Sequence, residues 1–371
     1  MTKNENIGIS KAHAGLEGVV AAETALSLVD GQAGRLVIAG YDLPDLVAET
    51  DFEGVVAKLW SAAGRETSHA EAKSAIAAAR VLAFEQVPIL LSAAGGLTIT
   101  EALRVGLSLL PDEHGQDASA RLVGAMPVFV AALARHAVGE RAVAPRAERS
   151  HAEDYLTMLT GQTPDAAATK AMDAYLTTAS DHGMNASTFT ARVVASTAAG
   201  PVSSVLAALC ALKGPLHGGA PGPVLDMLDD IGTPARIEPW LREAVMGGER
   251  LMGFGHRIYR VRDPRADVLG AEVHRLVGGE GRVSFALQVE ETAKAVLKEL
   301  KPHRPLDTNV EFYTAMLLEA LKIPRAAFTP TFAVSRVAGW TAHVMEQDKV
   351  GRLIRPASRY VGNVPEGLEV A

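Results

Sequence analysis

Four dipeptides that end in proline each mark the start of a predicted helix, and these start signals strongly constrain the fold. In each, a residue that can cap a helix precedes Pro, which is tolerated at the first helical position because its missing N–H would have no partner there. They are Thr163-Pro164, Thr233-Pro234, Asp263-Pro264 and Thr329-Pro330. Glycine pairs at 247–248 and 278–279 end two of the segments. The pattern predicts a succession of helices, with others over 284–300 and from Asn309 to about Leu321.

The remaining composition also favours helices. Aromatic residues make up only 5% of the chain, and clusters of β-branched residues are few. The exception lies near the N-terminus, where apolar runs at 25–29 and 35–38 flank a glycine-containing turn, Asp30 to Gly34. That arrangement is typical of a small hairpin. Because strands do not alternate with helices, we expect an all-α fold with a small N-terminal β-hairpin.

Charge and cysteine content exclude several classes of protein. The 371 residues carry 36 Lys and Arg against 43 Asp and Glu, a net charge of −7, and no basic run long enough for nucleic-acid binding. The single Cys210 excludes an internal disulfide and a thiolate-rich zinc cluster. The N-terminus lacks a secretory apolar core, and the apolar run at 122–134 is shorter than the roughly 20 residues of a membrane span. We expect a cytoplasmic protein without a membrane or nucleic-acid partner.

Four polar, glycine-rich segments are candidates for a functional site. They are Asp181 to Asn185, Gly214 to Ala220, Met252 to Arg257, and Asn309 to Phe312. Each places a titratable side chain beside a glycine loop or a helix end, where backbone can approach a ligand closely. Separately, each has a plainer interpretation, since a histidine beside glycine often has a structural role and a glutamate in a first turn complements the helix dipole. The histidines lack the helical spacing of metal ligands, so no metal centre is predicted.

Two arginines strengthen the case for an anion site. Arg265 falls in the first turn after Asp263-Pro264, where the helix dipole disfavours a cation unless an anion is bound there. Arg336 lies in an otherwise apolar helical stretch, where a buried guanidinium needs a carboxylate partner. For both arginines, the anion is either another side chain of the protein, forming an internal salt bridge, or an anionic substrate.

Six phrases of the sequence resemble the citrate synthase family. They are DHGMNASTFTARVVAST from Asp181, LKGPLHGGA from Leu212, MGFGHRIYRVRDPRADVL from Met252, NVEFYTAMLLEAL from Asn309, FTPTFAVSRVAGWTAHVMEQ from Phe328 and RLIRPASRYVG from Arg352. Their order and spacing fit the family from about residue 160 to 362, and GLEGVVAAETALSLVDG and RLVIAGYDLPDLV resemble its opening hairpin. Residues 55–150 match poorly. The joint occurrence of six phrases in order makes the resemblance highly specific.

The resemblance implies a helical homodimer whose chains each form a two-domain citrate synthase-like fold. The large domain, residues 1–217 and 321–371, would form the dimer and bind oxaloacetate. The small domain, residues 218–320, would bind CoA and close over the substrates, with His217 at the hinge. The additional N-terminal domain of the NADH-inhibited hexameric members has no counterpart, so we expect a dimer without that control.

The resemblance also implies catalytic roles. Glu311 would take a proton from the methyl group of acetyl-CoA, a step that requires a positioned base. His217 would donate a hydrogen bond to the thioester oxygen as charge develops, and His256 would donate one to the ketone of oxaloacetate.

Binding roles follow from the same match. Oxaloacetate would be held by His182, Arg265 and Arg336, with Arg355 reaching into the site of the other subunit. The implied CoA contacts are Arg250, Leu251, Met252, Gly253, Phe254 and Arg260. The substrates implied are oxaloacetate and acetyl-CoA, the latter as co-substrate, and no metal and no permanently bound cofactor is implied.

Two departures from the family pattern leave three functions open. The family most often has Asp where this chain has Glu311, and Asn-Glu where it has Pro221-Gly222. The first function is citrate synthase, and the second is 2-methylcitrate synthase, which uses propionyl-CoA as the donor. The third is a catalytically impaired relative that binds the same ligands without turnover. The two departures motivate it, whereas the complete set of matching histidines and arginines argues against it.

Overall fold

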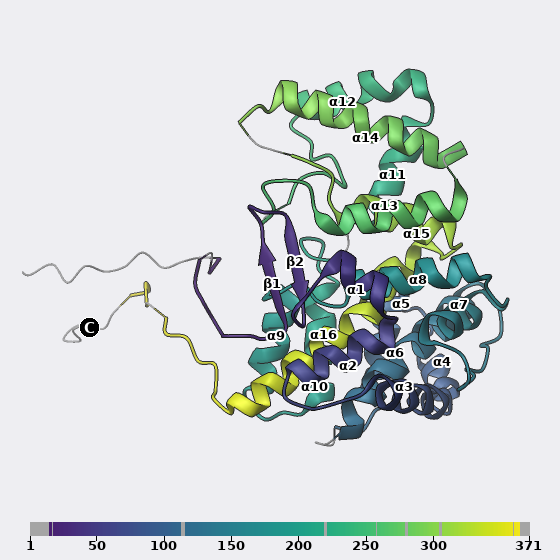
Figure 1. Ribbon diagram of the computed structural model, residues 1–371, viewed down its shortest axis with the longest axis vertical. Coiled ribbons are helices and arrows are strands. Elements are labelled where there is room, and N and C mark those ends of the chain that lie inside the picture. Colours follow the sequence, from purple (N-terminus) through teal and green to yellow (C-terminus); the bar gives the residue numbers. More distant parts are fainter. Residues whose placement is uncertain are drawn as a thin grey trace, which may run out of the picture.

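The computed structural model describes residues 15–16, 18–112, 116–218, 221–256, 258–278, 281–303, 306–358 and 360–363. Apart from one small sheet it is helical, as the sequence predicts (Figure 1). The strands are β1 Ser27–Asp30, β2 Arg35–Ile38 and β3 Tyr41–Asp42. The helices are α1 Leu43–Glu49, α2 Phe52–Ala62, α3 His69–Phe84, α4 Val87–Ala93, α5 Ile99–Ser108, α6 Gln116–Ala137, α7 His151–Thr160, α8 Ala166–Ala179, α9 Ala186–Ala195, α10 Pro201–Leu212, α11 Pro221–Ile231, α12 Ile237–Met246, α13 Pro264–Val277, α14 Gly281–Leu300, α15 Val310–Ala320 and α16 Phe328–Val350. Single 3₁₀ turns, Pro234–Arg236 and Arg325–Ala327, precede α12 and α16.

The helices gather in two parts. Helices α11 to α15 form the upper part in Figure 1, and α1 to α10 with α16 form the lower part. Within the upper part α13 packs against α15, and it also packs against α8 of the lower part. The predicted small domain, residues 218–320, corresponds in extent to α11 through α15. Its closure over a substrate remains a prediction.

The poorly matching region, residues 55–150, folds around α6. This helix packs against α3, α5, α7 and α16, and its Val123, Met126 and Phe129 are fully buried. One window of it, Ala118–Ala137, is long and apolar enough to cross a membrane, but 89% of the window is buried within the fold. It is therefore a helix of the buried core.

A buried ion pair joins α3 to α7 in the same region. Arg80 donates from Nε to Asp154 at 2.9 Å, and both side chains have no exposed surface. Arg80 also donates to the carbonyl oxygen of Arg149 at 2.9 Å. The pair satisfies two charges that would be costly to bury singly.

The predicted hairpin is the first part of a three-stranded antiparallel sheet. β1 pairs with β2 from Ser27 opposite Ile38 to Asp30 opposite Arg35. β2 then pairs with β3, which the sequence analysis did not predict, since a two-residue strand carries no alternation signal. In Figure 1 the β1–β2 hairpin points from the lower part toward the upper one.

Helix starts follow the predicted dipeptides closely but not uniformly. Asp263 caps α13 by accepting the N–H of Arg265. The helix expected at Thr163-Pro164 begins later, because Asp165 supplies the cap by accepting the N–H of Ala168 at 2.7 Å. Thr233-Pro234 opens a 3₁₀ turn rather than α12 directly, and Thr329-Pro330 lies inside the first turn of α16. Proline is tolerated throughout a first turn, so it marks a helix start only approximately.

The close crossing of α3 and α6 predicts a stability effect at Gly124. A Cβ there would lie 2.7 Å from Cβ of Ala79 and 2.8 Å from the backbone nitrogen of Arg80. We expect Gly124→Val to lower the free energy of unfolding by about 1–3 kcal/mol through overpacking, as measured by urea denaturation. Gly222→Ala is the matched control, because that helical glycine faces open space. Equal effects of the two substitutions would contradict this account of the crossing.

Candidate active site

Two of the candidate histidines meet at the junction of the upper and lower parts. His182 follows α8, and His256 lies in the loop before α13. Their ring centroids are 5.6 Å apart in an edge-on arrangement. The hydroxyl of Tyr259 lies 3.2 Å from Nε2 of His182, and its ring centroid lies 4.7 Å from that of His256. Arg265 joins them, with Nη2 at 3.3 Å from Nε2 of His256. The sequence analysis predicted three of these four residues and missed Tyr259.

The surroundings of His256 determine which ring nitrogen carries the proton. Its Nδ1 accepts the backbone N–H groups of Ile258 at 3.0 Å and Tyr259 at 3.1 Å. Burial, followed by the positive charge of Arg265, lowers the pKa of His256 to about 4. The neutral ring must therefore hold its proton on Nε2. His256 is thus a neutral hydrogen-bond donor on the side where Arg265 lies.

His217 is oriented in a similar way from the lower part. Its Nε2 accepts the backbone N–H of Ser187 at 3.3 Å and lies 2.8 Å from the Ser187 hydroxyl. That hydroxyl also accepts Nε1–H of Trp340 at 3.2 Å. Burial, followed by the charge of Arg336, lowers the pKa of His217 to about 4. Its proton therefore resides on Nδ1, which makes this histidine a second neutral donor.

Arg265 has the internal salt bridge that the sequence analysis left open. Asp263 accepts from Nη2 at 2.8 Å and from Nε at 3.0 Å, and both residues are buried. The same carboxylate accepts the backbone N–H of Val310 at 3.2 Å, at the start of α15. Asp263 therefore ties Arg265 to the helix that carries Glu311. The dipeptide Asp263-Pro264 suggested only a helix cap, so this second role was missed.

Arg336 differs from Arg265 in having no carboxylate partner among the described residues. Only 1% of its surface is exposed, and its Nε donates to the carbonyl oxygen of Ala179 at 2.6 Å. Burial lowers its pKa to about 10, while the charge of Asp181 acts in the opposite direction. A buried guanidinium without an ion pair is suited to an anionic ligand.

The two guanidinium groups act on all three histidines. Besides burial, Arg265 and Arg336 both depress the pKa of His182, which lies well below its ordinary value. Arg336 does the same to His217, and Arg265 to His256. Electrostatic effects of this kind weaken with distance. The three imidazoles and two guanidinium groups, distant in the chain, therefore share one region of the structure.

Glu311 stands in the first turn of α15, where Asn309 caps the helix by accepting its N–H at 3.0 Å. Its Oε2 is buried and has no hydrogen-bond partner among the described residues. Burial raises the pKa of Glu311 to about 7, although the charges of Arg250 and Arg265 oppose the shift. A carboxyl group with this pKa can accept and release a proton near neutral pH.

The segment from Arg250 to Phe254 is held against the start of α15. Asn309 donates its backbone N–H to the carbonyl oxygen of Gly253 at 2.9 Å, and Phe254 stacks against Phe312 with ring centroids 5.6 Å apart. The side chains of Leu251 and Phe254 are buried in the core, and Met252 is half-buried. Of this strip, only Arg250 is exposed, and Met252 is partly so.

Three of the predicted arginines lie at the surface. Arg250, Arg260 and Arg355 are all exposed. Arg250 nevertheless acts electrostatically on Glu311 and His256, which places it at the edge of the site. Arg355 lies in the extended segment that follows α16 and leaves the body of the molecule in Figure 1. A role for Arg355 in a second subunit remains a prediction.

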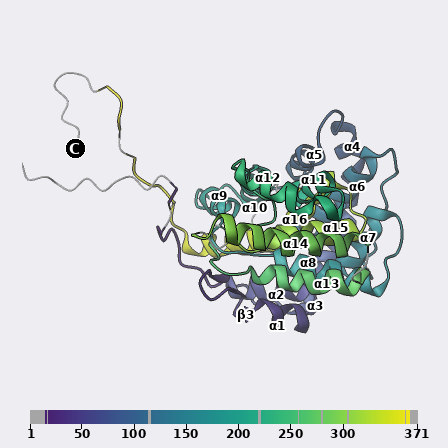
Figure 2. The ribbon, with the colours of Figure 1, turned by 90° about the horizontal axis from the view of Figure 1, so that it is seen from above.

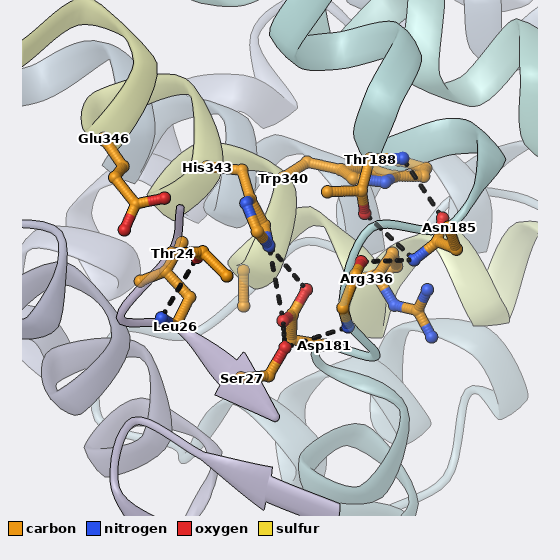
Figure 3. A network of polar contacts seen from close by, with 12 residues as sticks. Thr24, Leu26, Ser27, Asp181, Asn185, Thr188, Arg336, Trp340, His343 and Glu346 are labelled. Carbon is orange, nitrogen blue, oxygen red and sulfur yellow. Dashed lines mark hydrogen bonds and ion pairs between the residues drawn. The ribbon is translucent and has the colours of Figure 1, made fainter. Parts of the chain in front are cut away.

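A buried polar network supports the loop that carries His182 (Figure 3). Asp181 accepts from the hydroxyl of Ser27 at 2.5 Å, and its carboxylate lies 3.3 Å from Nε2 of His343. His343 Nδ1 lies 3.1 Å from Nη1 of Arg192. The sequence phrases contain Asp181 and His343, but their pairing, 162 residues apart, has no local signal.

Close backbone approach fixes the same loop against α16. The N–H of Gly339 donates to the carbonyl oxygen of Ser180 at 3.1 Å, and a Cβ on Gly339 would lie 2.4 Å from that oxygen. A side chain at position 339 would therefore separate α16, with its Arg336, from the His182 loop.

Within the described parts of the chain, no group of three His, Cys, Asp or Glu side chains is placed to hold a metal ion. The site is instead built from neutral imidazoles, guanidinium groups and one protonatable carboxyl. That donor set suits a substrate with carboxylate and carbonyl groups.

Comparison with known proteins agrees with this chemistry. The family model described as "Citrate synthase, C-terminal domain" matches residues 15–357. A citrate synthase from Haloferax volcanii is 36% identical over 365 residues, covering 94% of this chain and 95% of the relative. A 2-methylcitrate synthase from Mycobacterium tuberculosis is 34% identical over 362 residues, covering 94% and 90%. The structure resembles that of Thermoplasma acidophilum citrate synthase in a ternary complex with carboxymethyl coenzyme A and oxaloacetate. The TM-score is 0.86 and the identity 27%, over 95% of this chain and 97% of that one.

The raised pKa of Glu311 predicts a pH-dependent stability effect. Its carboxyl has a pKa of about 7 in the folded protein against an ordinary value of 4.5, so the folded state binds more protons between these pH values. Wild-type stability therefore falls as pH rises from about 4.5 through about 7, and Glu311→Gln removes this loss. We expect the stability of Glu311→Gln relative to wild type to increase by roughly 2–3 kcal/mol between pH 4.5 and 8. Chemical denaturation at both pH values measures it, and a difference independent of pH would contradict the burial of this carboxyl.

Proposed function

Because the chain belongs to the citrate synthase family, we propose that it condenses acetyl-CoA with oxaloacetate to form citrate and CoA. The observation that carries the proposal is the orientation of His217 and His256. His256 accepts two backbone N–H groups on one ring nitrogen and His217 accepts one, and both rings are neutral, so the other nitrogen of each is left as a hydrogen-bond donor. Neutral donors of this kind can stabilise, by hydrogen bonds, the negative charge that develops on two carbonyl oxygens during the reaction.

Glu311 is the proposed base. It removes a proton from the methyl group of acetyl-CoA while Nδ1–H of His217 donates to the thioester oxygen, which yields an enol or enolate. The new carbanionic carbon attacks the ketone carbon of oxaloacetate, whose oxygen accepts a hydrogen bond from Nε2–H of His256 as it becomes an alkoxide. The alkoxide takes up one proton to become the hydroxyl of the product, and this uptake offsets the proton that Glu311 removed. Water then hydrolyses the thioester and releases citrate and CoA. A base with a pKa of about 7 suits the first step near neutral pH.

The proposed oxaloacetate site consists of His182, Arg265 and Arg336. Arg336 is the strongest candidate, because its buried guanidinium has no ion pair among the described residues. We also propose a homodimer, in which Arg355 of a second copy completes the site. Its place in an exposed segment beyond α16 is suited to contact with another subunit.

The CoA moiety is assigned to the backbone of Arg250–Phe254, with Arg260 near its phosphates. The exposed guanidinium groups of Arg250 and Arg260 are able to meet phosphate oxygens. Acetyl-CoA enters as a co-substrate, and the proposed mechanism requires no resident cofactor or metal. The domain of residues 218–320 is proposed to close over both substrates.

A second candidate function is the 2-methylcitrate synthase reaction, with propionyl-CoA as the donor. It is favoured by the 2-methylcitrate synthase relative, which is 34% identical to this chain, close to the 36% of the citrate synthase relative. One additional methylene changes the discrimination of a pocket by only about 1–3 kcal/mol. Where the family usually has Asp, this chain has Glu311, whose side chain is longer by one methylene. The position of the base relative to the acyl group is therefore relevant to the choice between acetyl-CoA and propionyl-CoA.

Release of free CoA thiol tests the proposal. We expect the wild-type protein to release CoA with oxaloacetate and acetyl-CoA, and His217→Ala and His256→Ala to lower kcat by about 10²–10³-fold, as for loss of an oxyanion donor. His136→Ala is the control, because that histidine ends α6 outside the site. A higher kcat/KM with propionyl-CoA would select the second function. No release with either donor would favour a protein that binds these ligands without turnover.

Arg336→Lys tests the proposed carboxylate contact separately. A lysine ammonium cannot offer the planar pair of donors that a guanidinium presents to a carboxylate. We expect the KM for oxaloacetate to rise by roughly tenfold or more, with a smaller change in the KM for acetyl-CoA. Steady-state kinetics with each substrate varied in turn measures both values. An unchanged oxaloacetate KM would remove Arg336 from the site.

A further inference from the structure

The β1–β2 hairpin contacts the loops of both histidines that are assigned to oxaloacetate. At its base, the hydroxyl of Ser27 donates to Asp181 at 2.5 Å and accepts the backbone N–H of Gly183 at 2.9 Å. These residues flank His182. One hydroxyl therefore bridges both sides of that histidine from a strand more than 150 residues away. Val29, next on the same face of β1, packs beside Gly183.

At its tip, the same hairpin touches the loop that follows His256. The carbonyl oxygen of Gly31 accepts the backbone N–H of Arg260 at 2.8 Å. A Cβ on Gly31 would lie 2.4 Å from the carbonyl oxygen of Ile258, and one on Gly34 would lie 2.8 Å from Cγ2 of Val261. The turn therefore fits against this loop only because two of its positions lack side chains.

The contacted loop is the one that orients His256. Ile258, which meets Gly31, supplies one of the two N–H groups that His256 Nδ1 accepts, and Tyr259 supplies the other. The Tyr259 hydroxyl then reaches His182 at 3.2 Å. The hairpin thus closes a ring of contacts that runs from one histidine to the other.

The base of the hairpin is also anchored to α16 and to the core. The backbone N–H of Ala25, just before β1, donates to Glu346 of α16 at 2.8 Å. Glu346 also pairs with the buried Arg192. Leu26 and Ile38 are fully buried in the core. Because the hairpin is fixed to the lower part at its base, its tip can hold the loop that follows His256 at a set distance from the lower part.

We propose that the β1–β2 hairpin is a positioning element of the oxaloacetate site, with Ser27 and Gly31 setting the separation of His182 and His256. The inference rests on the proposed function, since it concerns the same substrate. Neither residue needs to touch the substrate. Both act through the backbone that holds the two imidazoles.

Gly31→Ala is the sharpest test. Gly31 does not have a positive φ, so the left-handed region places no strain on alanine, and the three atoms nearest the added methyl all belong to Ile258. We expect the KM for oxaloacetate to rise by about tenfold or more, because misplacement of about 1 Å can cost up to a hundredfold. The KM for acetyl-CoA should stay within about twofold. Gly95→Ala is the matched control, because nothing lies within 4 Å of the added atom.

Ser27→Ala tests the base of the hairpin in the same assay. Loss of the hydroxyl leaves Asp181 and the N–H of Gly183 without this partner, and we expect a similar selective rise in the oxaloacetate KM. Ser92→Ala is its control, since that hydroxyl bonds only to the local carbonyl of Ile89. Thermal unfolding of each variant, followed by circular dichroism, separates loss of fold from loss of position.

Hydrogen exchange provides a readout that does not depend on turnover. In the ligand-free protein, Gly31→Ala should speed amide exchange in the peptide containing Tyr259 and Arg260, while Gly95→Ala leaves it unchanged. If the wild type is active but both hairpin variants keep its oxaloacetate KM within twofold and its exchange pattern, this inference is wrong and the proposed function stands. If the wild type itself releases no CoA, the proposed function fails, and this inference fails with it.

Discussion

Burial of two guanidinium groups beside three imidazoles is the constraint on which the site depends. Arg265 is compensated by Asp263, whereas Arg336 has no carboxylate of the described chain against it. Together with desolvation, these charges keep His182, His217 and His256 neutral near physiological pH. The imidazoles are consequently placed to donate hydrogen bonds and not to act as cations, while Arg336 is the guanidinium of the two that has no ion pair among the described residues.

The same burial has the opposite effect on Glu311. Desolvation disfavours the charged form of every titratable group, so it lowers the pKa of a histidine and raises that of a carboxyl group. The result is a carboxyl group with a pKa of about 7 in the same region as His217 and His256, whose imidazolium forms have a pKa of about 4. One physical cause, removal from water, therefore leaves a carboxyl group that can hold a proton near neutral pH beside imidazoles that are uncharged there. The buried carboxylate of Glu311 in turn lowers the stability of the folded state above neutral pH.

Much of the architecture could be predicted because its signals are local. Asp263 capping α13, Asn309 capping α15 and the turn from Asp30 to Gly34 are each encoded within a few residues. Predictions were less accurate where neighbouring signals compete, as at Thr163-Pro164, where Asp165 takes the cap. The two-residue β3 was missed, because its pairing depends on β2 and not on its own composition.

The sequence by itself determined the helical class, the N-terminal hairpin and the candidate residues of the site, since caps, turns and family phrases are read along the chain. Only the tertiary structure decided how those residues are held. The tautomer of His256 depends on the backbone N–H groups of a folded loop, and that of His217 on Ser187 at the start of another helix. Contacts in space also determine three further features: Arg265 has an ion pair, Arg336 has none among the described residues, and Ser27 bonds to Asp181. A hydrogen bond or a pKa depends on which groups and how much water surround an atom, and sequence neighbours do not specify either.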